Sequence, residues 1–214
     1  MIRSRFVRSV AMLFTAVGIV SCADSSPTGP VAPATAQNGL LSGLIGDALN
    51  PVTAVVGFIA DATDIPIYPV KWGPARKAVS YSVSGTIMPW GGTLTIPEAD
   101  FTITFPYGAV SEPTAIKITS DSRYVAYKME PRGITFAAPV VVTQGLQNTV
   151  VYGQPLSGQL FGAYIPDDRL DLKRLIYALE IEISTTIFAP GSTLFPQTEV
   201  WIINHFSRYI LASG

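Results

Sequence analysis

The chain has 214 residues, of which 48% are apolar and 14% are charged, and it contains one histidine and one cysteine. A single cysteine excludes an intrachain disulfide, and one residue of each type excludes zinc sites built only from histidine and cysteine. The formal net charge of −1 excludes the strongly basic surface that is typical of nucleic-acid-binding proteins.

Residues 1–21 have the pattern of a secretory signal peptide. Arg3, Arg5 and Arg8 precede an uncharged apolar run of 11 residues from Val10 to Val20. A helix needs ~20 apolar residues to cross a bilayer, so this run predicts an export signal rather than a membrane span. Export would remove three of the 14 basic side chains and none of the 15 acidic ones, which leaves a net charge of about −4. We therefore expect no nucleic-acid partner.

The signal ends in Ile19-Val20-Ser21-Cys22, which resembles the lipobox of bacterial lipoproteins. This resemblance implies that Cys22 becomes the N-terminal residue and carries a diacylglycerol on its thiol. The protein would then be exported and lipid-anchored to the cell envelope through Cys22. Ala23 follows the cysteine, which indicates the outer membrane rather than retention at the inner membrane. The alternative is an ordinary signal peptide that is cleaved elsewhere.

The next two segments connect this signal to the main domain. Residues 22–38 are rich in Ser, Pro, Thr and Ala and lack aromatic side chains, which predicts a disordered tether. Within residues 39–69, apolar side chains recur with helical spacing from Leu40 to Leu49. We expect a short helix that packs on the domain or on a partner, and contact with the membrane surface is the alternative.

From residue 70 to residue 214 the apolar pattern changes to a period of two, as in half-buried strands. The stretches that alternate most clearly are Ser80–Ile87, Phe101–Phe105 and Leu179–Ser184. The last of these would direct Glu180 and Glu182 toward water. Clusters of Gly and Pro separate the alternating runs. This pattern predicts an all-β domain, an antiparallel β-sandwich, over residues 70–214.

Several motifs lie at a characteristic spacing between Thr86 and Leu211. They are Gly91-Gly92, Pro106 with Gly108-Ala109-Val110, Glu130-Pro131-Arg132-Gly133 with Phe136 and Pro139, and His205-Phe206-Ser207-Arg208-Tyr209. Together they resemble the ZU-five domain shared by ankyrins, netrin receptors and zonula-occludens proteins, and more closely the version carried by bacterial lipoproteins. The resemblance implies a sandwich that serves as a binding or scaffolding module. Bacterial relatives often have histidine where this chain has Arg132, and the middle from Gln147 to Ser184 matches weakly.

The only histidine lies in the tripeptide His205-Phe206-Ser207. In some animal relatives and in a nuclear-pore protein, a His-Phe-Ser tripeptide is cleaved before the serine by an N→O acyl shift. The resemblance therefore implies that Ser207 attacks the Phe206 carbonyl while His205 accepts its proton, a role suited to an imidazole at neutral pH. Such a reaction needs a turn or bulge at Phe206 and donors for the oxyanion. The alternative is structural: Phe206 fills the core of the last strand.

A partner surface is most readily expected at exposed tryptophans, and Trp72 and Trp90 are the candidates, with core burial as the alternative for both. The sequence contains no phosphate-binding glycine loop and no nucleophile elbow. We therefore expect no cofactor, no metal and no enzymatic activity apart from self-cleavage. The function that we expect is a lipid-anchored cell-envelope module that binds an unknown protein or envelope partner, with self-processing as the alternative.

Overall fold

The computed structural model describes residues 53–56, 65–165, 172 and 176–214. The signal peptide, Cys22, the tether and the expected helix from Leu40 to Leu49 lie outside these residues. No helix among the described residues has the length and apolar character needed to span a membrane.

The described residues are organised almost entirely as strands, with one short 3-10 helix, η1 (Pro97–Ala99). The strands are β1 (Thr53–Val56), β2 (Ile65–Pro69), β3 (Ser82–Ile87), β4 (Gly92–Ile96), β5 (Phe101–Phe105), β6 (Thr114–Ser120), β7 (Ala126–Glu130), β8 (Thr135–Gly145), β9 (Leu160–Ile165), β10 (Ile176–Ala178), β11 (Glu180–Ile181), β12 (Ser184–Phe188), β13 (Pro196–His205) and β14 (Arg208–Ser213).

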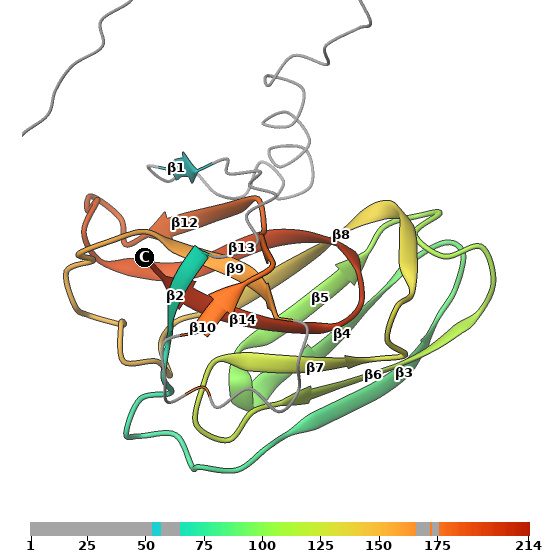
Figure 1. The fold of residues 1–214 in the computed structure, drawn as a ribbon, viewed down its shortest axis with the longest axis horizontal. Helices are drawn as coiled ribbons and strands as arrows, with labels where there is room; N and C mark the ends of the chain where they lie inside the picture. Colours follow the sequence, from blue (N-terminus) through green and yellow to red (C-terminus); the bar gives the residue numbers. More distant parts are fainter. Residues whose placement is uncertain (1–52, 57–64, 166–171, 173–175) are drawn as a thin grey trace, which may run out of the picture.

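These strands form two antiparallel sheets that pack as a sandwich, as the sequence predicts (Figure 1). The six-stranded sheet has the order β1-β12-β13-β8-β5-β4. The eight-stranded sheet has the order β10-β2-β14-β7-β6-β3, with β9 pairing β14 and β11 pairing β9. Strands β13 and β14 follow one another in sequence but belong to different sheets, so the chain crosses from one sheet to the other between them.

The main core lies between the two sheets and is rich in aromatic side chains. Phe101 packs on Tyr127, with ring centroids 4.0 Å apart, across the two layers. The largest completely buried side chain in this core is that of Trp201. A second apolar cluster, which contains Phe161, Ile176 and Ile210, involves strands β9, β10 and β14 of the eight-stranded sheet. The fold therefore holds together by apolar burial, without a disulfide.

The alternation predicted for the first two stretches is confirmed. In β5, Phe101, Ile103 and Phe105 are buried whereas Thr104 is exposed. In β3, Ile87 is buried and the polar residues are exposed. Half-buried strands need this division because each has one face on the core and one in water.

The alternation predicted for Leu179–Ser184 is wrong. Leu179 is exposed, whereas Glu182 and Ser184 are buried. The chain leaves the eight-stranded sheet after β11 and enters the six-stranded sheet at β12, so the stretch does not follow one sheet face. The Ser184 hydroxyl stabilises this crossing. It accepts a hydrogen bond from the Gly162 amide and donates one to the Glu182 carbonyl.

The sandwich also extends further toward the N-terminus than the predicted start at residue 70. Strand β1 pairs with β12, and strand β2 pairs with both β10 and β14. Both strands fall within residues 39–69, where the sequence analysis expected an apolar segment with a short helix. Their short length hides any periodicity, so only the pairing with distant strands identifies them.

Candidate functional site

The tripeptide His205-Phe206-Ser207 forms the connection between the two sheets. Strand β13 ends at His205 in the six-stranded sheet, and β14 begins at Arg208 in the eight-stranded sheet. The structural alternative, in which the tripeptide lies within one last strand, is wrong, whereas the turn at Phe206 that self-cleavage requires is present. The runs on either side of the junction are apolar because both strands are buried, and the polar residues between them fit a bulge within one strand as well as a turn between two strands.

Phe206 fixes this turn from the inside. Its side chain is buried in the main core and makes edge contacts with Phe136 and Phe105, with centroid distances of 4.8 and 5.9 Å. Aromatic pairs at these distances and near-perpendicular angles are favourable beyond the area that they bury. The structural role expected for Phe206 is thus present in the fold.

The backbone of the turn is held by β7 and by the loop between β7 and β8. The Gly133 amide donates a hydrogen bond of 3.0 Å to the carbonyl oxygen of Phe206. The Phe206 amide donates in turn to the Ile134 carbonyl at 2.8 Å, and the Met129 amide donates to the Ser207 carbonyl at 2.9 Å. The carbonyl that a Ser207 nucleophile would attack therefore already faces an N–H donor.

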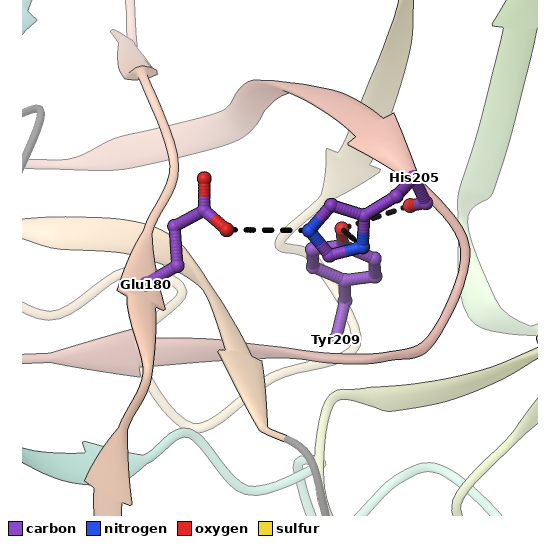
Figure 2. Close-up of polar contacts among 3 residues, drawn as sticks. All are labelled: Glu180, His205 and Tyr209. Atoms are coloured by element: carbon purple, nitrogen blue, oxygen red, sulfur yellow. Dashed lines mark hydrogen bonds and ion pairs between the residues drawn. The ribbon is translucent and has the colours of Figure 1, made fainter. Parts of the chain in front are cut away.

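The imidazole of His205 lies between a carboxylate and a phenol (Figure 2). Its Nε2 atom is 3.2 Å from Glu180 Oε2, and its Nδ1 atom is 3.1 Å from the Tyr209 hydroxyl. The same hydroxyl donates to the His205 carbonyl oxygen at 2.9 Å. Tyr164 contacts the ring edge-on, with centroids 4.9 Å apart. Both ring nitrogens are thus engaged by Glu180 and Tyr209.

A second carboxylate, Glu182, completes a cluster with Glu180 and His205. One potential ligand atom from each of the three residues lies within 4.8 Å of the others. Glu182 is 6% exposed, and its Oε1 atom has no hydrogen-bond partner among the described residues. Burial and then the neighbouring Glu180 raise the pKa of Glu182 to about 8, partly offset by the nearby Tyr209 hydroxyl. Chemically, these groups can hold a proton or a cation.

The tripeptide also borders an open hollow of about 460 Å³. Its lining residues come from the β7–β8 loop, β8, β9 and the turn itself: Arg132, Gly133, Thr135, Tyr164, His205, Phe206 and Ser207. Ser207 is only 7% exposed. A water molecule or small ligand in this hollow would therefore meet His205 and the backbone of the turn before the serine side chain.

The two predicted partner-surface tryptophans have different environments. Trp72 is 7% exposed, its Nε1 atom donates to the Asp121 carbonyl at 3.0 Å, and the Arg76 guanidinium lies 3.9 Å from its ring centroid. Trp72 is therefore a core residue and is not available as a docking surface. Trp90 is 66% exposed in the turn that joins β3 to β4.

The residues that surround His205 and Trp90 in the structure were not predicted from the sequence. Tyr107 is 82% exposed on the turn after β5. This turn lies next to the turn that carries Trp90, since the Gly108 amide donates a hydrogen bond to the Pro89 carbonyl at 2.7 Å. Glu182 was expected to face water. Glu180 and Glu182 in an otherwise apolar stretch were the only sequence feature that could have indicated a site here. The crossing of the chain between the two sheets is what brings them close to His205.

No protein-family model matches the chain, and no curated protein is significantly similar to it in sequence.

Proposed function

We propose that this protein is a lipid-anchored β-sandwich of the bacterial cell envelope that acts as a binding or structural interaction module. The observation that carries this proposal is the pair of exposed aromatic side chains Trp90 and Tyr107 on adjacent turns. Trp and Tyr supply large contact areas with few rotatable bonds, and they concentrate binding energy in interfaces. Two such side chains on adjacent turns are suited to recognising an envelope protein.

The backbone beneath this pair supports the same role because it is well fixed. The hydrogen bond from Gly108 to Pro89 ties the two turns together. Gly91 has a φ of 95°, and a Cβ atom there would clash with the Phe105 carbonyl oxygen. A surface that is ordered before binding loses less conformational entropy on association. The lipobox at Cys22, the expected net charge of about −4 and the ZU-five resemblance point to the envelope and away from nucleic acid.

The test is capture of partners from native envelope by chemical cross-linking to the full-length protein. We expect cross-linked proteins that are lost in the double variant Trp90→Ser/Tyr107→Ser. The matched control is Tyr152→Ser/Tyr177→Ser, which removes two other exposed aromatics, one of them on β10 at the opposite end of the eight-stranded sheet from β3. The same captured proteins with both double variants would contradict the proposal.

A second candidate function, self-processing at Phe206-Ser207, is favoured by the hydrogen bond from the Gly133 amide to the Phe206 carbonyl. In the reaction, Ser207 Oγ would bond to the Phe206 carbonyl carbon as its proton leaves to His205, whose ring would first have to exchange a contact with Glu180 or Tyr209 for one with Ser207. The carbon–nitrogen bond would then break, and the amide nitrogen would take up the proton, giving an ester and a free amine. Water would hydrolyse the ester to a Phe206 carboxylate. The Gly133 N–H would stabilise the negative charge on the carbonyl oxygen.

Intact mass spectrometry of purified protein tests this candidate. Self-processing predicts a mass loss that matches Ser207 to Gly214, or both pieces held together until denaturation. The loss should disappear in Ser207→Ala and persist in Ser213→Ala, which removes a hydroxyl from the same short segment. An intact chain after prolonged incubation at neutral pH would leave the tripeptide with its structural role alone.

A further inference from the structure

Three side chains of the kinds that bind metals meet beside the turn between β13 and β14. Glu180 lies in β11, Glu182 follows it, and His205 ends β13. The potential ligand atoms all lie within 4.8 Å of one another, although His205 is 23 residues from Glu182 in sequence. We propose that Glu180, Glu182 and His205 form a binding site for a divalent transition-metal ion of the zinc class.

The His205 ring has its two nitrogens against different groups (Figure 2). The Tyr209 hydroxyl has one proton and faces both the His205 carbonyl oxygen at 2.9 Å and Nδ1 at 3.1 Å. When the hydroxyl donates to the carbonyl, Nδ1 carries the proton of a neutral ring and donates it to the hydroxyl oxygen. The lone pair of Nε2 would therefore point at the Glu180 carboxylate, 3.2 Å away. Two acceptors facing each other need a cation or a proton between them.

Glu182 supports the site independently of His205. Its side chain is 6% exposed, and within the described part of the chain its Oε1 atom has no hydrogen-bond partner. A buried polar atom without a partner is rare, because burial removes the hydrogen bonds that water would have made. A metal ion among these three residues would give Oε1 the electrostatic partner that the protein itself does not supply.

The chemistry of the donors selects the class of ion. Imidazole and carboxylate together suit Zn²⁺ and similar transition metals, whereas Ca²⁺ and Mg²⁺ prefer oxygen donors alone. Ligand atoms at ~2.1 Å in a tetrahedral zinc site lie about 3.4 Å apart, close to the observed separation of His205 Nε2 and Glu180 Oε2. The Tyr209 hydroxyl on Nδ1 is the kind of supporting partner that fixes a ligating imidazole.

Three protein ligands leave room for a further ligand on a four-coordinate ion. His205 and Tyr164 also line the hollow of about 460 Å³, so this further position is close to an opening to solvent. The site is separate from the aromatic pair Trp90 and Tyr107, and the inference does not depend on the proposed partner surface.

The test is Zn²⁺ binding to the full-length, tag-free protein after treatment with a chelator. We expect one Zn²⁺ per chain by titration calorimetry and a raised thermal midpoint, with no such response to Mg²⁺ or Ca²⁺. His205 is the only histidine, so the ¹⁵N resonance of its Nε2 atom should shift when Zn²⁺ is added. Glu182→Gln and His205→Asn should each weaken binding at least tenfold.

Two further variants make the result decisive. Glu199→Gln alters another buried glutamate that has an unpartnered oxygen but lies outside the cluster, so Zn²⁺ binding should be unchanged. Glu180 is half-exposed, so Glu180→Gln should fold even if Glu182→Gln does not, and it should also weaken binding. No Zn²⁺ binding to the wild-type protein, or wild-type affinity in Glu180→Gln and His205→Asn, would overturn the metal site.

Discussion

The indole ring of Trp201 lies directly against Gly162, and a Cβ atom at residue 162 would come 2.5 Å from Trp201 Cγ. Trp201 lies in β13 and Gly162 in β9, so this contact joins the six-stranded sheet to the eight-stranded one. The completely buried indole has little space in which to move. The glycine therefore sets how closely the two sheets approach next to the candidate site.

Gly162→Ala should lower the free energy of unfolding by about 1–3 kcal/mol, because the added methyl group overpacks the core. Urea denaturation measures the change. Gly85→Ala is the matched control, since its Cβ would meet only the flexible end of the half-buried Leu94 side chain. Equal unfolding midpoints for the two variants would mean that the sheets can separate to accommodate the methyl group.

Glu199 should make the stability of the fold depend on pH. Its carboxyl group is completely buried, and burial raises its pKa well above the usual range, although the Thr186 hydroxyl donates to Oε2 at 2.6 Å. The folded protein therefore keeps a proton that the unfolded chain releases above pH ~4.3. This contribution to stability is fully present below that pH and is lost as the pH rises toward the folded-state pKa, at about 1.4 kcal/mol per pH unit.

Glu199→Gln should remove the contribution of Glu199 to the pH dependence of stability. The difference in the free energy of unfolding, variant minus wild type, should therefore increase from pH 5 to pH 8. The measurement is chemical denaturation at each pH. Glu98→Gln, at an exposed position in η1, serves as the control and should follow the wild-type profile. Parallel profiles for wild type and Glu199→Gln would contradict the raised pKa.

Tyr127→Phe should destabilise the core by about 1–3 kcal/mol, because it leaves a buried acceptor without a donor. The Tyr127 hydroxyl donates to Gln144 Oε1, and Gln144 Nε2 donates to the carbonyls of Ala99 and Gly145. Thermal unfolding followed by circular dichroism measures the effect. Tyr152→Phe removes an exposed hydroxyl and should change little. An unchanged melting temperature for Tyr127→Phe would require a water molecule in place of the hydroxyl.

Cys22→Ala tests the proposed anchor. A thiol-linked diacylglycerol should hold the protein on membranes through burial of its acyl chains, worth ~0.8 kcal/mol per buried CH₂ group. Fractionation of cells that express the variant should show the protein shifted from the membrane to the soluble fraction, or held as an uncleaved precursor. Ser21→Ala keeps the cysteine and should remain lipidated. Membrane partitioning and processing identical to the wild type would exclude the lipobox.

The sequence by itself determined the class of fold, because alternating apolar side chains in β3 and β5 require one buried and one solvated face. The single cysteine likewise determined that apolar burial stabilises the sandwich without a disulfide. These properties depend on local spacing and composition, which a sequence displays directly.

Only the tertiary structure decided where the chain crosses between sheets, and the candidate site depends on those crossings. The polar residues at positions 204, 205, 207 and 208 interrupt the apolar run, but they fit a bulge as well as a turn, and the turn at Phe206-Ser207 becomes visible only when each strand has its partners. Glu182 was expected in water, but the passage from β11 to β12 buries it beside His205. Pairing between distant strands sets these positions, and no local periodicity encodes which strands will meet.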